Sequence, residues 1–158
     1  MLLLVLQFNS IRRSAIVLLT VPLSIIGVVP GLLLCGSYFG FMALLGVLSL
    51  AGIVINNAIV LLDRISIEIQ EGRSPAFAVI ASAQKRLRPI LLTTATTILG
   101  LLPLWFGDDP MWVPMAISII FGLAFATLLT LGVVPVLYAL FFRVPFEDFD
   151  YDKELVNT

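Results

Sequence analysis

Residues 41–63 read FMALLGVLSLAGIVINNAIVLLD, and they carry no charge before Asp63. An uncharged, mostly apolar stretch of about 20 residues is long enough to cross the hydrocarbon core of a bilayer. A helix satisfies its backbone hydrogen bonds internally in lipid, whereas a lone strand does not. The stretch therefore predicts a membrane-spanning helix, and this helix contains two adjacent polar side chains, Asn56 and Asn57.

Three more stretches predict spanning helices for the same reason. Tyr38, Trp105 and Trp112 fall at span ends, where such rings meet the membrane–water interface. The predicted fold class is an all-α membrane protein with four transmembrane helices. We place the spans of this 14–142 bundle at about 14–34, 41–62, 89–106 and 112–142.

The composition excludes several classes of function. Hydrophobic residues make up 60% of the chain and charged residues 12%, against about 45–50% and about 25% in soluble domains. A soluble enzyme is therefore excluded, and the chain offers no nucleophile–base pair. The sequence has no His, and Cys35 is its one Cys, so we predict no metal site, no cofactor and no internal disulfide. A net charge of −1 argues against nucleic-acid binding.

Basic residues lie on one side of the predicted membrane. The loops at 35–40 and 107–111 contain no Lys or Arg. All nine basic residues lie before the first span, between the second and third, or after the fourth. Because cytoplasmic loops are enriched in Lys and Arg, we predict that the Arg12 region, the connector 63–88 and the tail 143–158 lie in the cytoplasm.

The first residues, MLLLVLQF, are apolar but few. As a helix they would cover about 12 Å, less than half of a ~30 Å hydrocarbon core. They lack the basic n-region and small-residue cleavage site of a signal peptide. We interpret 1–9 as the end of a truncated transmembrane helix, a half-helix that continues from an earlier segment. A short re-entrant or interfacial segment is the alternative.

The connector 63–88 predicts structure of its own. Residues 63–71 extend the second helix until Gly72 breaks it, and Ser74 with Pro75 forms a helix start, Ser as N-cap and Pro at N1. Apolar residues then recur at helical spacing in 76–88. We predict a cytoplasmic amphipathic helix here that packs on the bundle rather than sensing lipid. The tail 143–158 is acidic and polar, which is typical of a mobile segment.

Small residues four positions apart mark close helix packing. The first span contains Gly27 and Gly31, and the fourth contains Ser118, Gly122 and Ala126. These pairs predict helix contacts and say little about function.

Polar residues within the spans are the candidate functional residues. Asn56 lies about 10 Å inside Asp63 and Thr93 about 6 Å inside Pro89, so the two can meet at similar depth. A structural reading competes with the functional one, because Thr can bond its own helix and Asn can hold helices together. No Asp, Glu, Lys or Arg lies within any span. A proton-driven carrier needs a buried group that titrates, so this group would have to lie on another segment or subunit.

Four stretches lie in order between about residue 5 and residue 142: LQFNSIRRSAIVLLTVPLSIIGVV, FGFMALLGVLSLAGIVINNAIVLLD, RLRPILLTTATTILGLLP and LLTLGVVPVLYALF. On these stretches the sequence is identified as a member of the resistance-nodulation-division family of efflux permeases. The resemblance fits the hydrophobe/amphiphile, or multidrug, type.

The resemblance implies the last four of twelve spanning helices, with the end of the eighth. Members are homotrimers of the bacterial inner membrane that couple proton entry to the export of drugs, detergents, dyes or metal ions. The resemblance therefore implies as partners the rest of the permease chain, a periplasmic adaptor and an outer-membrane channel, besides the lipid bilayer. In the drug pumps protons load onto an Asp pair on the fourth helix, and periplasmic domains bind the substrate.

Residue roles carry over by position. The drug-pump relay has a Lys that corresponds to Asn56, and this is a departure, because Asn carries no positive charge. Asn57 matches the following Asn of the motif. A Thr and an Arg of the relay match Thr93 and Arg86, although Arg86 also fits a simple anchor at the inner membrane face. The resemblance thus predicts that this chain forms one wall of a proton path and that the chain alone does not transport.

Two other readings stay open. The chain can be a complete small four-span scaffold or assembly protein, with Asn56 and Asn57 holding an oligomer together. It can also belong to another exporter of the same superfamily, one that moves lipids, metal ions or proteins.

Overall fold

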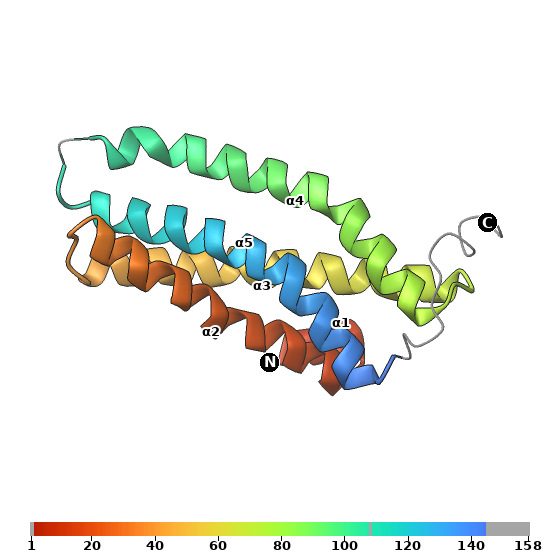
Figure 1. Ribbon diagram of the computed structural model, residues 1–158. Helices are drawn as coiled ribbons and strands as arrows, with labels where there is room; N and C mark the ends of the chain where they lie inside the picture. Colours follow the sequence, from red (N-terminus) through yellow and green to blue (C-terminus); the bar gives the residue numbers. More distant parts are fainter. Residues whose placement is uncertain (1, 108, 145–158) are drawn as a thin grey trace.

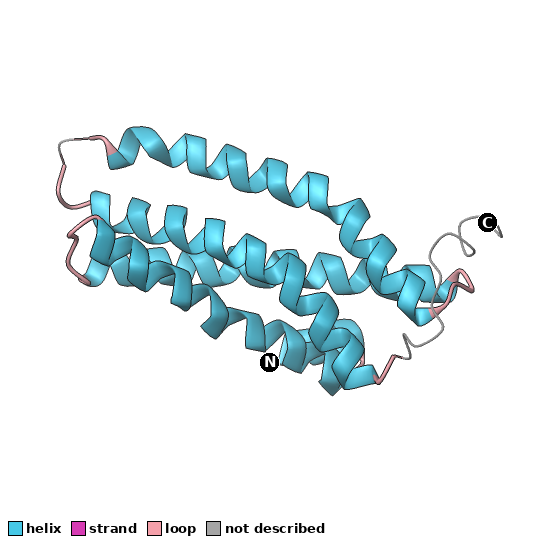
Figure 2. Cartoon of the chain, in the orientation of Figure 1, coloured by secondary structure: helices cyan, strands magenta, loops and turns pink. Residues whose placement is uncertain are grey.

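The computed structural model describes residues 2–107 and 109–144. Within these ranges the chain forms five helices and no strand (Figures 1 and 2). The predicted tail lies outside the described residues from position 145 onward. The helices are α1 (Leu2–Phe8), α2 (Ile11–Leu34), α3 (Phe41–Gln70), α4 (Pro75–Trp105) and α5 (Val113–Phe142).

Helices α2 to α5 are each long and apolar enough to cross a membrane, which confirms the predicted all-α membrane fold. Helix α3 extends beyond its apolar stretch to Gln70, and α4 begins at Pro75, before the expected third span at about 89–106. A helix of 30 residues is about 45 Å long, and this exceeds a ~30 Å hydrocarbon core. The last turns of α3 therefore extend past the core.

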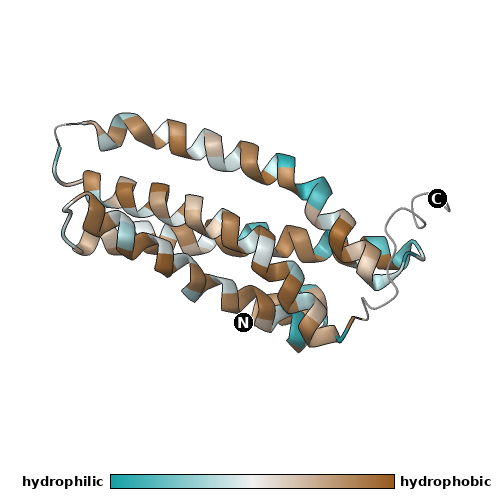
Figure 3. Ribbon diagram, in the orientation of Figure 1, coloured by the Kyte–Doolittle hydropathy of each residue, from teal (hydrophilic) through white to brown (hydrophobic). Residues whose placement is uncertain are grey.

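The amphipathic segment and the third span form one continuous helix, α4, and not two separate helices. No glycine interrupts 75–99, and Pro89 lies inside the helix. A proline removes one backbone hydrogen bond and bends a helix without necessarily ending it. Figure 1 shows α4 changing direction along its length, and Figure 3 shows its hydrophilic residues gathered between apolar stretches. These residues are Gln84, Lys85, Arg86 and Arg88.

The four long helices alternate in direction, so their ends gather in two places (Figure 1). We call the end with residues 9–13, 63–88 and 143 the basic end, because the Lys and Arg residues of the described ranges lie there. The opposite end holds the loops 35–40 and 106–112. Helix α5 contacts α2, α3 and α4 and lies at the centre of the bundle.

Two apolar clusters fill the bundle. The cluster at the basic end joins all five helices, through Leu4, Ile16, Val17, Ala58, Leu61, Leu62, Ile65, Ala78, Val79, Val134 and Tyr138. Ala78 and Val79 belong to the amphipathic segment of α4, so this segment packs on the bundle. The second cluster lies toward the opposite end and joins α2, α3 and α5.

The turn between α3 and α4 is fixed by a buried carboxylate. Glu68 has no exposed side-chain surface, and its oxygens lie 2.6 Å from Arg64, 2.6 Å from Lys85 and 2.8 Å from Arg73. Gly72 follows with a φ of +86°, and the Ser74 hydroxyl accepts a hydrogen bond from the Phe77 N–H at 3.3 Å. The predicted helix start at Ser74 and Pro75 is thus present.

Candidate functional site

The outward face of α3 carries polar residues among apolar ones. The buried residues of α3 form one stripe that faces the bundle, and Asn56 lies on the opposite side of the helix with an exposed side chain. Ser49, Gly52 and Asp63 are exposed on the same side. Asn57 is half-buried at the edge of this face. Within residues 2–107 and 109–144 neither asparagine side chain has a hydrogen-bond partner.

A second polar face lies on α4. Thr93, Thr96 and Gly100 are exposed there, and Thr97 is half-buried. The three threonine hydroxyls donate to carbonyls of their own helix, at Ile90 (2.9 Å), Leu92 (2.8 Å) and Thr93 (2.8 Å). Each hydroxyl oxygen keeps lone pairs, so it can still accept a hydrogen bond from a further donor.

Arg86 lies seven residues before Thr93 on nearly the same side of α4, about 10 Å away along the axis. Its side chain is half-buried. Among the carboxylates of the described ranges, Asp63, Glu68, Glu71 and Asp109, none forms an ion pair with Arg86.

The structure does not join Asn56 to Thr93. Both side chains are exposed, and no hydrogen bond connects them within the described part of the chain. The two polar faces are parts of a surface left open by α3 and α4. Whether a further segment brings these residues together stays a prediction.

One polar contact was missed in the sequence. Thr94, the neighbour of Thr93, is buried, and its hydroxyl lies 2.8 Å from the hydroxyl of Thr127 on α5. The sequence shows four threonines close together in α4. Thr94 lies one helical turn after Ile90, which is also buried, so both face the bundle, whereas Thr93 does not.

The predicted packing residues lie between α2, α3 and α5. A side chain at Gly27 would collide with Phe125, and one at Gly31 would collide with Phe121. A side chain at Gly122 would collide with Leu50 and Val28. Ser118 and Ala126 are buried on α5, and the Ser118 hydroxyl donates to the Pro114 carbonyl at 2.8 Å. These residues let α5 approach α2 and α3 closely.

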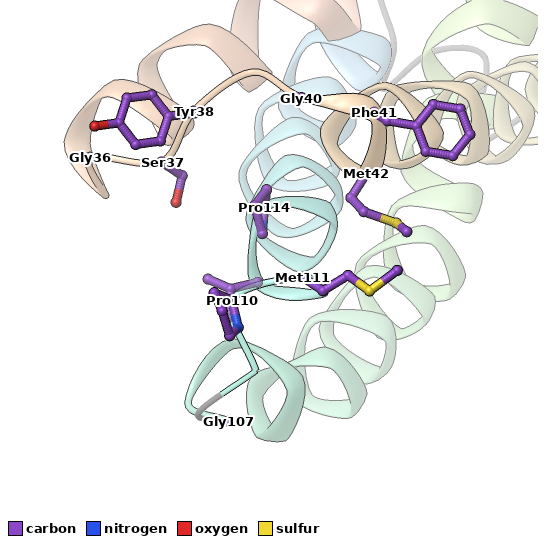
Figure 4. Close-up of a pocket in the computed structure, with 11 residues that line it drawn as sticks. Gly36, Ser37, Tyr38, Gly40, Phe41, Met42, Gly107, Pro110, Met111 and Pro114 are labelled. Carbon is purple, nitrogen blue, oxygen red and sulfur yellow. The ribbon is translucent and has the colours of Figure 1, made fainter.

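A cavity of about 780 Å³ opens at the opposite end of the bundle, between the loops 35–40 and 106–112 (Figure 4). Its lining is mainly apolar and includes Tyr38, Phe41, Met42, Met111 and Pro114. None of the predicted relay residues lines it. Within the described ranges, no group of three or more His, Cys, Asp or Glu side chains is arranged to hold a metal ion.

The polar faces of α3 and α4 carry no titratable group in the membrane-spanning stretches 41–62 and 89–106. An amide such as Asn56 offers two donors and an acceptor. It can donate to an ionised carboxylate and accept from a protonated carboxylic acid. A polar face of this kind in a spanning helix is costly against lipid and favours a protein or aqueous neighbour.

Comparison with known proteins places the chain in a family. The family model described as the AcrB/AcrD/AcrF family matches residues 1–142. The swarming motility protein SwrC of Bacillus subtilis (strain 168) is 38% identical over 141 residues, which cover 87% of this chain and 13% of that protein.

Solved structures of efflux pumps are also similar to this chain. One crystal form of a heavy metal efflux pump matches with a TM-score of 0.80 and 31% identity, over 90% of this chain and 14% of that one. A second crystal form matches with a TM-score of 0.75 and 30% identity, over 90% of this chain and 15% of that one. The present chain thus spans about one-seventh of the length of these relatives. It belongs to the AcrB/AcrD/AcrF family, the resistance-nodulation-division permeases, as the resemblance in its sequence predicted.

Proposed function

We propose that this chain is the C-terminal membrane portion of a proton-coupled efflux permease of the bacterial inner membrane. In this proposal the outward faces of α3 and α4 form one wall of the proton path, and export requires the remaining helices and periplasmic domains. The basic end faces the cytoplasm, as its Lys and Arg content favours. The assembly is a homotrimer that works with a periplasmic adaptor and an outer-membrane channel.

The observation that carries the proposal is the exposed Asn56 on a polar face of a spanning helix. Exposed amides in a span need a polar neighbour, and the charge-free stretches 41–62 and 89–106 need a titrating group from elsewhere if they serve proton transfer. A carboxyl group opposite Asn56 would meet both needs.

The neutral side chain also explains how this wall can work without a lysine. A lysine facing a carboxylate would lose its partner's charge whenever the carboxylate takes up a proton. An amide carries no charge and hydrogen-bonds to both forms of the carboxyl group. Asn56 can therefore stay in place through the whole protonation cycle, with Asn57, Thr93 and Arg86 as further polar groups of the path.

Export in a full-length permease tests the proposal. Asn56→Leu and Thr93→Val should each slow export at normal expression and normal trimer assembly. Leu92→Val, an exposed apolar site on α4 next to Thr93, is the matched control and should leave export unchanged. Normal export by both polar variants would remove these residues from the mechanism.

The cargo has two candidates. The resemblance in sequence favours drugs and other amphiphiles, whereas the two structural relatives are described as heavy metal efflux pumps. We favour drug and proton antiport, because the sequence resembles the hydrophobe/amphiphile type of permease. Cells that carry the permease should then gain tolerance to drugs and detergents; a gain in tolerance to metal salts alone would identify metal export instead.

A further inference from the structure

A second cavity lies at the basic end. The start of α2 and the end of α5 meet at this end of the bundle (Figure 1). Its volume is about 620 Å³, and it is lined by Arg12 from α2 and by Leu140, Phe141, Phe142 and Arg143 from the end of α5. Two guanidinium groups thus share one cavity with an apolar wall. None of the proposed relay residues lies in it.

These arginines have no acidic partner among the residues that the structure describes. Arg12 and Arg143 are exposed, and neither forms an ion pair with a carboxylate of the described ranges. Arg13 lies beside them, with its guanidinium carbon 5.9 Å from the centre of the Phe142 ring. The buried Nε of Arg13 also lacks a hydrogen-bond partner among the described residues. Among residues 2–107 and 109–144, this corner of the bundle therefore has three cationic side chains and no carboxylate paired with them.

The backbone and the apolar surroundings match an amphiphile. Arg143 ends α5 in the left-handed conformation, with a φ of +48°, directly after the apolar stretch of that helix. Leu140 is 70% exposed, Phe141 42% and Ile11 70%. Cations next to exposed apolar side chains at the end of a span lie at the level where lipid headgroups meet the acyl chains.

We propose that the cavity between Arg12 and Arg143 binds the phosphate headgroup of an anionic phospholipid of the inner leaflet, with an acyl chain along Leu140 and Phe141. The assignment to the inner leaflet rests on the proposed cytoplasmic position of the basic end. Arginine pairs with phosphate through charge-assisted hydrogen bonds, and basic pockets between spanning helices on the cytoplasmic side suit such headgroups.

Lipid binding to the full chain in detergent micelles tests this site. Native mass spectrometry would count phosphatidylglycerol and, separately, phosphatidylcholine with the same acyl chains. We expect phosphatidylglycerol to bind more tightly than phosphatidylcholine. Arg12→Gln and Arg143→Gln should each weaken phosphatidylglycerol binding about five-fold, because one cation at the membrane surface contributes about this factor to the affinity. The double variant should weaken it about thirty-fold. Phosphatidylcholine binding should not change.

Arg88→Gln is the matched control, because Arg88 is exposed at the basic end but does not line the cavity. It should leave phosphatidylglycerol binding unchanged. Equal binding of the two lipids, or an equal loss in Arg88→Gln, would overturn the proposal in favour of diffuse attraction. Size-exclusion profiles of the variants would verify that each one remains folded.

Two further experiments test whether something other than a lipid fills the cavity. Displacement of phosphatidylglycerol by inorganic phosphate at equal concentration would show a site for soluble anions instead of lipid. A chain shortened after Val144 removes the acidic residues between 147 and 154. If only the shortened chain selected phosphatidylglycerol, the tail would be the natural occupant and the lipid proposal would fail. These experiments measure lipid binding and not export. A negative result in them therefore does not contradict the proposed transport function, and a negative export result does not contradict lipid binding.

Discussion

The hydroxyl oxygens of Thr94 on α4 and Thr127 on α5 lie 2.8 Å apart in a buried contact. Thr127 donates its own hydroxyl hydrogen to the Leu123 carbonyl at 2.7 Å. A hydroxyl has one hydrogen to donate, so Thr94 is the donor to Thr127. The bond joins the least buried of the four spans to the most buried one, and it helps to hold α4 against the bundle.

We predict that Thr94→Val lowers the free energy of unfolding by about 1 kcal/mol or somewhat less, the range of hydrogen bonds between membrane helices. The valine keeps the shape of the side chain but leaves Thr127 without its donor. Thermal unfolding in detergent would measure the loss. Thr93→Val, one position away on the exposed side, should leave stability nearly unchanged, and equal losses in the two variants would contradict this assignment.

Gly27 on α2 lies against Phe125 on α5 so closely that an added Cβ would collide with the phenylalanine side chain. We predict that Gly27→Ala destabilises the bundle by about 1–3 kcal/mol, as expected when a well-packed contact is forced apart. Gly132 on α5 is the matched control, because nothing lies within 4 Å of a Cβ built there. Gly132→Ala should be neutral or stabilising, since alanine favours helix. Equal melting temperatures for Gly27→Ala and the wild type would show that the helices are free to separate.

The spans were predictable because lipid imposes one simple requirement, a charge-free apolar helix of sufficient length. The helix start at Ser74 was predictable for a different reason, because N-capping depends on local sequence alone. The continuity of α4 through Pro89 did not follow, because a proline can end a helix or only bend it. Tertiary packing decides between these outcomes. Ala78 and Val79 of α4 pack into a core formed by residues far away in the sequence.

The candidate site was predictable in residue type and less so in position. Asn56 stood out because an amide within a span is rare. Whether Thr93 or Thr94 faces the bundle depends on the rotation of α4, which the contact with Thr127 reveals. Glu68 also gave no signal, since its three cations come from α3, the turn and α4, and meet only after the chain reverses direction.

Glu68 should therefore be a sensitive position. We predict that Glu68→Gln lowers the free energy of unfolding by about 1–2 kcal/mol, because it leaves Arg64, Arg73 and Lys85 close together without their common anion. The three cations are partly exposed, and solvent weakens their repulsion. Glu71→Gln is the control, because the half-exposed Glu71 lies 3.9 Å from Arg73 and forms no other ion pair within residues 2–107 and 109–144. A loss of equal size in Glu71→Gln would assign the effect to net charge rather than to the buried cluster.

The same cluster predicts a dependence on pH. Burial works against ionisation of Glu68, but the hydrogen bond and charge of Lys85 and the charges of Arg64 and Arg73 outweigh it, so the pKa of Glu68 lies below its usual value of 4.5. Stability from a carboxylate with a lowered pKa is fully present above the usual value and is lost as the pH falls through the lowered pKa.

The stability difference between the wild type and Glu68→Gln should therefore be constant from pH 7 down to about pH 5. It should shrink at lower pH, where the wild-type carboxylate becomes protonated and resembles the amide. Other carboxylates titrate in the same range, but they are common to both proteins and cancel in the difference. Thermal unfolding of the two proteins in detergent across this range measures it. A difference that grows on acidification would mean that Glu68 is harder to ionise in the folded chain, and that burial outweighs its three cations.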